Sequence, residues 1–188
     1  MRTIFVIYFL LTGPYCVDRA ELRPIIREHR QHFQEIGVNI IPRRIYVRAD
    51  APVTTLVKNR NYRFSSIQFL RWELSKKNRL LRSGRVHFII PPTIEGDGTR
   101  YMIGQSSGVC KKRGTSMTSA TLVNQRGELR SHESAAAISH ELGHLLGASA
   151  VHPTDCSLMD YGVLGCSHEG NHFNAESAAQ INACMRNL

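Results

Sequence analysis

The chain has 188 residues, enough for one domain with a hydrophobic core, and its 42% apolar and 21% charged residues are ordinary for a globular protein. The net charge of +9 comes from scattered basic residues without a glycine-rich phosphate loop or a zinc-finger spacing, so we expect no nucleic-acid binding. The sequence holds no repeat, low-complexity tract or long linker, and we therefore treat residues 1–188 as a single domain.

Residues 1–16 allow two interpretations. Their apolar run, residues 3–11, is typical of a short signal peptide, but no small-x-small cleavage site follows, because Gly13 is trailed by Pro14. The run is too short to span a membrane. Its β-branched and aromatic residues also fit a buried parallel strand, which we favour. A secretion signal would then lie upstream of this sequence.

The next two elements are a helix and a strand. Residues 18–21 are expected to form a turn, and Pro24 suits the first position of a helix that ends at Gly37. Residues 38–47 are expected to form a strand, in which Pro42 indicates an edge position or a bulge. The predicted helix has an apolar face of Ile25, Ile26, Phe33 and Ile36.

Four further elements are expected between residues 65 and 123. Residues 65–84 begin with a Ser-x-x-Gln capping box and predict a helix. Residues 86–90 predict a buried strand ended by two prolines. Residues 101–109 predict a glycine-loosened edge strand, and residues 118–123 predict another strand.

Ser131 is expected to cap a helix that carries His140, Glu141 and His144. Positions i and i+4 share one helical face, so the two histidines can bind one zinc ion. Glu141 lies beside them and can take a proton from a zinc-bound water. The alternative is a surface helix with two unrelated histidines. The residues expected to face the core are Ala135, Ile138, Leu142, Leu145 and Leu146.

The residues at the end of this helix and after it resemble those of a known class of enzymes. Gly147 completes an HExxHxxG run, and residues 156–161 hold a methionine, Met159, in a turn; together they resemble the metzincin zinc endopeptidases. The resemblance implies a third ligand after the glycine and a methionine turn beneath the metal as an apolar floor. Tyr161 occupies the place of a tyrosine that reaches the zinc in astacins and serralysins, so it is either a transition-state donor or a packing residue.

The sequence departs from the metzincin pattern at the third ligand. The expected position holds Ala150, which cannot bind metal. A two-residue insertion would bring His152 to the zinc, and this is the ligand we predict. Asp155 is an alternative, as is a missing third ligand. His168 and His172 are more distant candidates and are better explained as solvated loop histidines.

The five cysteines contain no CxxC pair, which argues against a cysteine zinc site. Four of them make an even set that suits two disulfides in an oxidising compartment, with buried free thiols as the alternative. We favour a pair that ties the final helix to the sheet, Cys110 with Cys184, and a pair that closes the methionine turn, Cys156 with Cys166. Cys16 is left over.

The predicted element order resembles the reprolysin (adamalysin-like) branch of the metzincins. Residues 101–110 resemble its glycine-rich edge strand and cysteine, and residues 171–181 resemble the entry to its C-terminal helix, which Asn174 is expected to cap. The resemblance implies an α/β (α+β) fold: a twisted, mostly parallel five-stranded sheet with one antiparallel edge strand, an active-site helix, and a small C-terminal subdomain with the methionine turn.

The function implied is that of a secreted, extracellular zinc endopeptidase. Zn²⁺ would be held by His140, His144 and His152, and Glu141 would act as the base in the cleavage of protein or peptide substrates. The alternative is a catalytically impaired, metzincin-like secreted binding protein, which Ala150 favours. The net charge of +9 suits weak binding to anionic surfaces or glycans, and equally a solvated basic surface.

Overall fold

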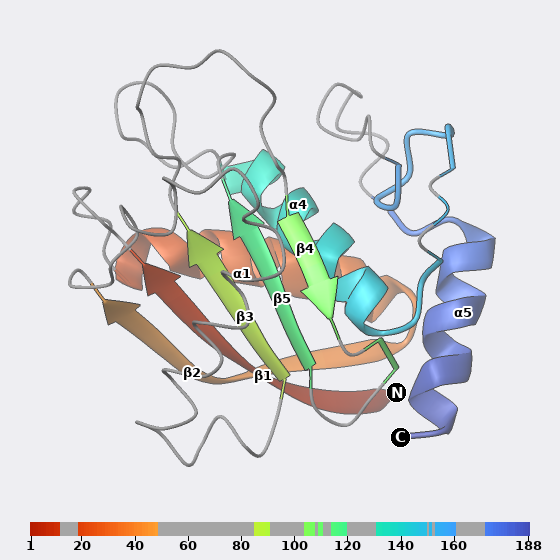
Figure 1. Ribbon diagram of the computed structural model, residues 1–188, viewed down its shortest axis with the longest axis horizontal. Coiled ribbons are helices and arrows are strands. Elements are labelled where there is room, and N and C mark those ends of the chain that lie inside the picture. The colour runs from red at the N-terminus through yellow and green to blue at the C-terminus, as the bar shows by residue number, and fades with distance from the viewer. Residues whose placement is uncertain are drawn as a thin grey trace.

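The computed structural model describes residues 1–11, 19–48, 85–90, 104–107, 109–110, 114–119, 131–149, 151, 153–160 and 172–188. The expected mixed α/β architecture is confirmed. The described strands are β1 (Arg2–Leu11), β2 (Val38–Arg48), β3 (Arg85–Ile90), β4 (Gly104–Ser107) and β5 (Gly114–Ser119), and they form one sheet in the order β2-β1-β3-β5-β4 (Figure 1). β4 is antiparallel to β5, and the other pairs are parallel.

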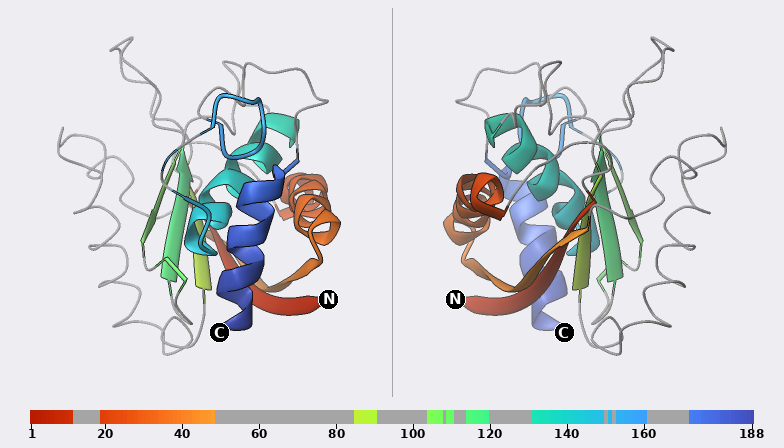
Figure 2. Two further views of the ribbon diagram at one scale, coloured as in Figure 1. Left: turned by 90° about the vertical axis from the view of Figure 1, so that its right-hand side faces the viewer. Right: turned by 90° about the vertical axis from the view of Figure 1, so that its left-hand side faces the viewer.

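The described helices are α1 (Arg19–Glu35), α4 (Ser131–Leu145) and α5 (Ala175–Arg186). They lie on one side of the sheet (Figure 2). α1 packs against α4 and β2, and α4 packs against β4 and β5. No helix in the described part of the chain is long and apolar enough to cross a membrane.

β1 is an interior strand, paired on one side with β2 and on the other with β3. Its side chains alternate as a strand requires. Ile4, Val6 and Tyr8 enter the core under the helices, whereas Phe5 between them is 54% exposed. Residues 2–11 therefore form a strand, as favoured over the signal-peptide interpretation.

Among the described strands, β2 lies at an edge of the sheet, and it contains an irregularity at Pro42. Val6 pairs with Pro42, but the next residue of β1, Ile7, pairs with Arg44, so Arg43 is an extra residue in the ladder. Proline has no N–H to donate to a neighbouring strand, which explains why the register shifts here. Both features predicted from Pro42, the edge position and the bulge, are present.

The predicted start of α1 was wrong. The helix begins at Arg19 rather than at Pro24, so most of the expected turn at residues 18–21 is helical, and Pro24 lies inside the helix. One proline this close to the N-terminus removes a single hydrogen bond, and the buried face of the helix compensates for it. Gly37 ends this segment with a φ of +79°, as its position predicted.

The expected strand at residues 118–123 was placed too late. β5 covers Gly114–Ser119, and residues 120–123 lie outside the described residues. β5 was missed because Met117 is its only large apolar residue, so no hydrophobic run marks it. β4 falls within the predicted edge strand at residues 101–109. The predicted helix at residues 65–84 lies outside the described residues.

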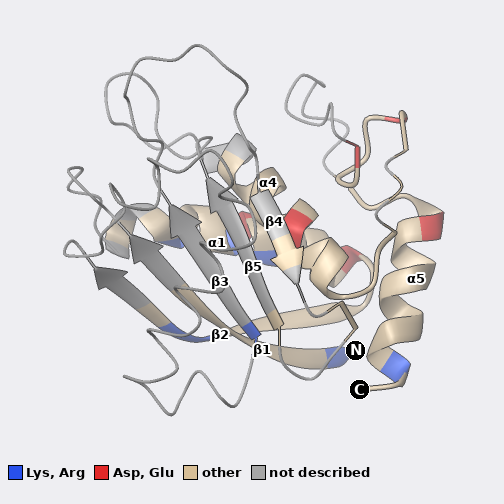
Figure 3. Ribbon diagram, in the orientation of Figure 1, with Lys and Arg blue, Asp and Glu red and all other residues tan. Residues whose placement is uncertain are grey.

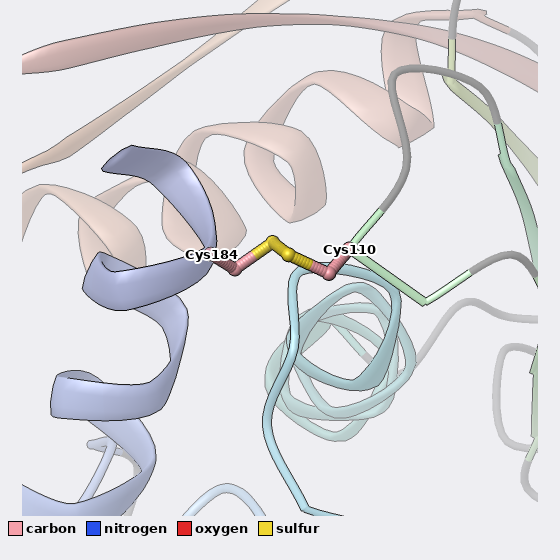
Figure 4. Close-up of a disulfide and its surroundings, with 2 residues drawn as sticks. All are labelled: Cys110 and Cys184. Atoms are coloured by element: carbon pink, nitrogen blue, oxygen red, sulfur yellow. A yellow bond between two sulfur atoms is a disulfide. The ribbon is translucent and has the colours of Figure 1, made fainter. Parts of the chain in front are cut away.

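The C-terminal elements follow the predicted capping. The Asn174 side chain accepts a hydrogen bond of 2.8 Å from the Ser177 backbone N–H at the start of α5, and Ile181 and Met185 are buried. Ser131 is the first residue of α4 rather than the residue before it. The predicted disulfide between Cys110 and Cys184 is confirmed, and it ties α5 to the segment that follows β4 (Figure 4).

Only one cysteine of the other predicted disulfide is among the described residues. Cys156 is disulfide-bonded, whereas its predicted partner, Cys166, lies outside the described residues, as does Cys16.

The Lys and Arg residues that the structure describes are spread over several elements, including β1, β2 and α5 (Figure 3).

Candidate metal centre

The two helical histidines face each other. The Nε2 atoms of His140 and His144 are 3.2 Å apart, and the two rings are nearly perpendicular with centroids 4.8 Å apart. The residues lie one turn apart on α4, so the spacing follows directly from helical geometry. His140 is buried, and His144 is partly exposed. The predicted convergence of this pair is therefore present.

Backbone carbonyls orient both rings from behind. His140 Nδ1 lies 2.7 Å from the Leu158 carbonyl oxygen, and His144 Nδ1 lies 3.4 Å from the Ala148 carbonyl oxygen. A carbonyl oxygen can only accept, so each of these bonds requires the proton on Nδ1. Rings that are neutral in this arrangement turn the lone pairs of their Nε2 atoms toward the same point. This is the arrangement that metal-binding histidines normally have.

The spacing of these two nitrogens fits a tetrahedral metal site. Two nitrogens bound to zinc at about 2.0–2.1 Å lie about 3.3 Å apart at a tetrahedral angle. The observed separation of 3.2 Å between the Nε2 atoms of His140 and His144 agrees with that value. Zinc accepts imidazole nitrogens readily, so the chemistry and the geometry of this pair both suit it.

Glu141 projects from the same helix and is 4% exposed. Burial removes water from its carboxyl group, which disfavours the charged form and raises the pKa of Glu141 to about 8. A carboxyl group with such a pKa exchanges protons near neutral pH. A cation held by the neighbouring histidines would favour the carboxylate and lower this pKa.

Met159 packs closely against Gly143 of the helix that bears the histidine pair. A Cβ atom built at Gly143, between the two histidines in sequence, would be 2.7 Å from Met159 Sδ and 3.0 Å from Phe173 Cε1. Gly143 therefore allows the methionine turn to approach the helix backbone closely. Met159 is 1% exposed, so its thioether is sealed into this contact.

Polar bonds shape the turn that carries Met159. The Asp160 carboxylate accepts a hydrogen bond of 2.9 Å from the Cys156 N–H, and Cys156 has a φ of +58°. Asp155 accepts bonds from the Ser157 N–H at 3.0 Å and from the Asn174 amide at 2.7 Å. These bonds, the Asn174 bond foremost, hold the pKa of Asp155 below its ordinary value.

The predicted third ligand is not among the described residues. His152 is outside the described residues, as are Ala150, Tyr161 and His168. Within the described part of the chain, no group of three or more His, Cys, Asp or Glu side chains could hold a metal ion. The alternative ligand Asp155 is thus not grouped with the histidine pair, because its oxygens hold the turn and α5 instead.

The C-terminal end of α4 is fixed by several contacts. Gly147 has a φ of +105°, and a Cβ atom there would lie 2.8 Å from Cys184 Cβ. The Cys110 N–H donates to the Leu145 carbonyl at 3.0 Å. The disulfide between Cys110 and Cys184 thus sits directly against the end of the histidine-bearing helix (Figure 4).

Two structural features of this centre were not predicted from the sequence. The backbone carbonyls of Leu158 and Ala148 orient the histidines, and a carbonyl leaves no mark in a sequence. The close approach at Gly143 also went unrecognised, although a glycine inside a strong helical pattern was a usable signal.

Comparison with solved structures places this centre in a known fold. The archaemetzincin from Methanopyrus kandleri matches over 98% of this chain and 96% of its own, with 18% identity and a TM-score of 0.63. Metalloproteinase-II from Bacteroides fragilis matches over 97% of this chain and 53% of its own, with 16% identity and a TM-score of 0.59. The chain has a zinc-metallopeptidase-like fold. No protein-family model and no curated protein matches the sequence.

Proposed function

We propose that this chain is a zinc-dependent endopeptidase of the metzincin type. The observation that carries the proposal is the pair of Nε2 atoms 3.2 Å apart, each on a ring whose Nδ1 proton is directed to a backbone carbonyl. His140 and His144 would be two ligands, and His152 would be the third. The likeness of the fold to an archaemetzincin and a metalloproteinase supports the proposal.

The residues of this chain would divide the work of hydrolysis. Zinc supplies a Lewis acid, which polarises a peptide carbonyl and makes water acidic near neutral pH. Glu141 would accept the proton of the attacking water and then pass it to the leaving amine. Its buried position on the same helix, next to His140, suits a group that must accept a proton from water and then release it.

The substrate would be an extended peptide. β4 ends the strand order of the sheet and packs against α4, the helix that bears the histidines. A peptide could add to this edge through backbone hydrogen bonds, which would hold its carbonyl groups near the centre without requiring a particular sequence.

We further propose that the protein is secreted and is related to the reprolysin branch. Two described features support an oxidising compartment: the disulfide between Cys110 and Cys184, and the disulfide of Cys156. The resemblance of residues 101–110 to the glycine-rich edge strand and cysteine of reprolysins is the sequence feature that suggests this branch.

A metal analysis combined with casein cleavage tests the function. We expect one zinc per chain and cleavage that a chelator abolishes and added zinc restores. Zinc binding without cleavage would favour the alternative of a metzincin-like binding protein, for which Ala150 at the usual ligand position is the supporting feature. A chain that neither binds zinc nor cleaves casein would contradict the proposal.

A further inference from the structure

A buried polar cluster joins α1 to α4 one residue before the first histidine of the metal centre. The Nδ1 atoms of His29 and His32 each lie 2.8 Å from the hydroxyl oxygen of Ser139. His29 and Ser139 are fully buried, and His32 is 4% exposed. The histidines are three residues apart, so both face α4 from the same side of α1.

The chemistry of the hydroxyl makes this contact specific. A serine hydroxyl has one proton to donate and two lone pairs that accept. Ser139 can therefore donate to one neutral imidazole and accept from the N–H of the other. Both bonds require the hydroxyl of Ser139 to sit between His29 and His32, because hydrogen bonds weaken quickly with distance and angle.

The α4 residues just before the cluster are less specific in shape. α4 presents three consecutive alanines before the cluster, at residues 135–137, and their small side chains provide little shape to resist rotation of the helix. The His29 ring packs edge-on against Phe33 with centroids 5.3 Å apart, and Phe33 packs against Phe173 at 4.8 Å. These ring contacts hold His29 in place, but none of the three rings belongs to α4.

We propose that Ser139, held by His29 and His32, positions α4 so that His140 and His144 converge on one point. A helix turns about 100° per residue, so a small rotation or slip of α4 would move the next residue, His140, away from the Leu158 carbonyl. The proposal rests on the proposed metal site, and it makes Ser139 a positioning residue that acts through the backbone of α4.

The test compares two serine-to-alanine variants of the same helix. Ser139→Ala removes the bridging hydroxyl. Ser134→Ala removes an equally buried hydroxyl from α4 whose oxygen has no hydrogen-bond partner in the structure. Zinc affinity is measured by competition with a chelating dye on variants whose folding is checked by near-UV circular dichroism. We expect Ser139→Ala to weaken zinc binding about tenfold and Ser134→Ala to leave it unchanged.

A second readout works without metal. Imidazole ¹⁵N NMR of the metal-free protein reports the tautomer of His140, which is protonated at Nδ1 while it donates to Leu158. We expect Ser139→Ala to replace this single tautomer with a mixture, and Ser134→Ala to retain it. If wild-type protein binds no zinc, the proposed function fails, but this spectrum still decides the positioning role.

Two variants of His32 cover the case in which Ser139→Ala does not fold. His32→Asn keeps a polar atom near the position of Nδ1, whereas His32→Leu fills the space without one. We expect His32→Asn to behave like the wild type and His32→Leu to show the mixed tautomers of Ser139→Ala. A His140 spectrum and a zinc affinity that are unchanged in Ser139→Ala, or in His32→Leu, would overturn the proposal.

Discussion

Met159 packs against the backbone of α4 at Gly143, the residue directly before His144. The contact leaves no room for a side chain, since an added Cβ atom would be 2.7 Å from Met159 Sδ. Met159 and the helix that bears the two histidines therefore constrain each other.

Gly143→Ala should destabilise the protein by about 1–3 kcal/mol, because overpacking against Met159 and Phe173 outweighs the roughly 1 kcal/mol that alanine adds to helix propensity. Urea denaturation measures the free energy of unfolding. The same substitution in a Met159→Ala background should be less costly, since the clash is relieved. An equal loss of stability in both backgrounds would contradict the close contact between Gly143 and Met159.

Glu141→Gln should leave zinc affinity within about threefold of the wild type while casein cleavage falls about 10²–10⁴-fold, because the amide cannot accept the proton of water. Folding should be retained, since burial already disfavours a charge at this position. Glu176→Gln, an exposed position on α5, is the matched control and should cleave normally. Full activity in Glu141→Gln would rule out this residue as the base.

His152→Ala should weaken zinc binding by more than about 100-fold, as should His144→Ala, since each would remove a ligand. Asp155→Ala should leave zinc affinity nearly unchanged, because its carboxylate holds the turn and α5 rather than joining the histidine pair. A chelator competition assay gives all three values. A loss of affinity in Asp155→Ala but not in His152→Ala would reverse the assignment.

Gly147→Ala and Gly37→Ala separate crowding from backbone strain. Both glycines have a positive φ, but an added Cβ atom meets nothing within 4 Å at Gly37 and lies 2.8 Å from Cys184 Cβ at Gly147. We expect about 1 kcal/mol of destabilisation at Gly37 and about 2–4 kcal/mol at Gly147 from thermal or urea unfolding. A similar loss of stability in both variants would show that the structure around Gly147 shifts to make room for the added methyl group.

Replacing Cys110 and Cys184 together by alanine should lower the free energy of unfolding by about 3–4 kcal/mol in non-reducing buffer, because the bond closes a sequence separation of 74 residues. The disulfide of Cys156 remains in this variant and serves as the internal control. A variant as stable as the wild type would show that α5 is held by packing alone.

Local patterns in the sequence predicted a large part of this molecule. The i and i+4 spacing predicted the convergence of His140 and His144, because helical geometry alone determines it. Asn174 predicted the start of α5, since an N-cap bond is formed within four residues. The edge and bulge at Pro42 followed from the missing N–H.

The features that escaped prediction depend on contacts distant in sequence. Ser139 meets residues more than 100 positions away, and no local pattern relates them. β5 is polar yet lies between two other strands, so its pairing rather than its composition makes it a strand. The start of α1 was predicted too late because proline is common in the first turn of a helix. Here Pro24 lies further inside the helix, where it is tolerated.

The position of β1 in the sheet also bears on how the chain is made. This apolar strand precedes both of its neighbours in sequence, and its partner on one side begins only at Arg85. During synthesis it leaves the ribosome long before that partner exists, and contacts of such separation form slowly. One edge of this apolar strand therefore stays unpaired until β3 has been made, so slower expression at low temperature or added chaperones should favour soluble recovery of the protein.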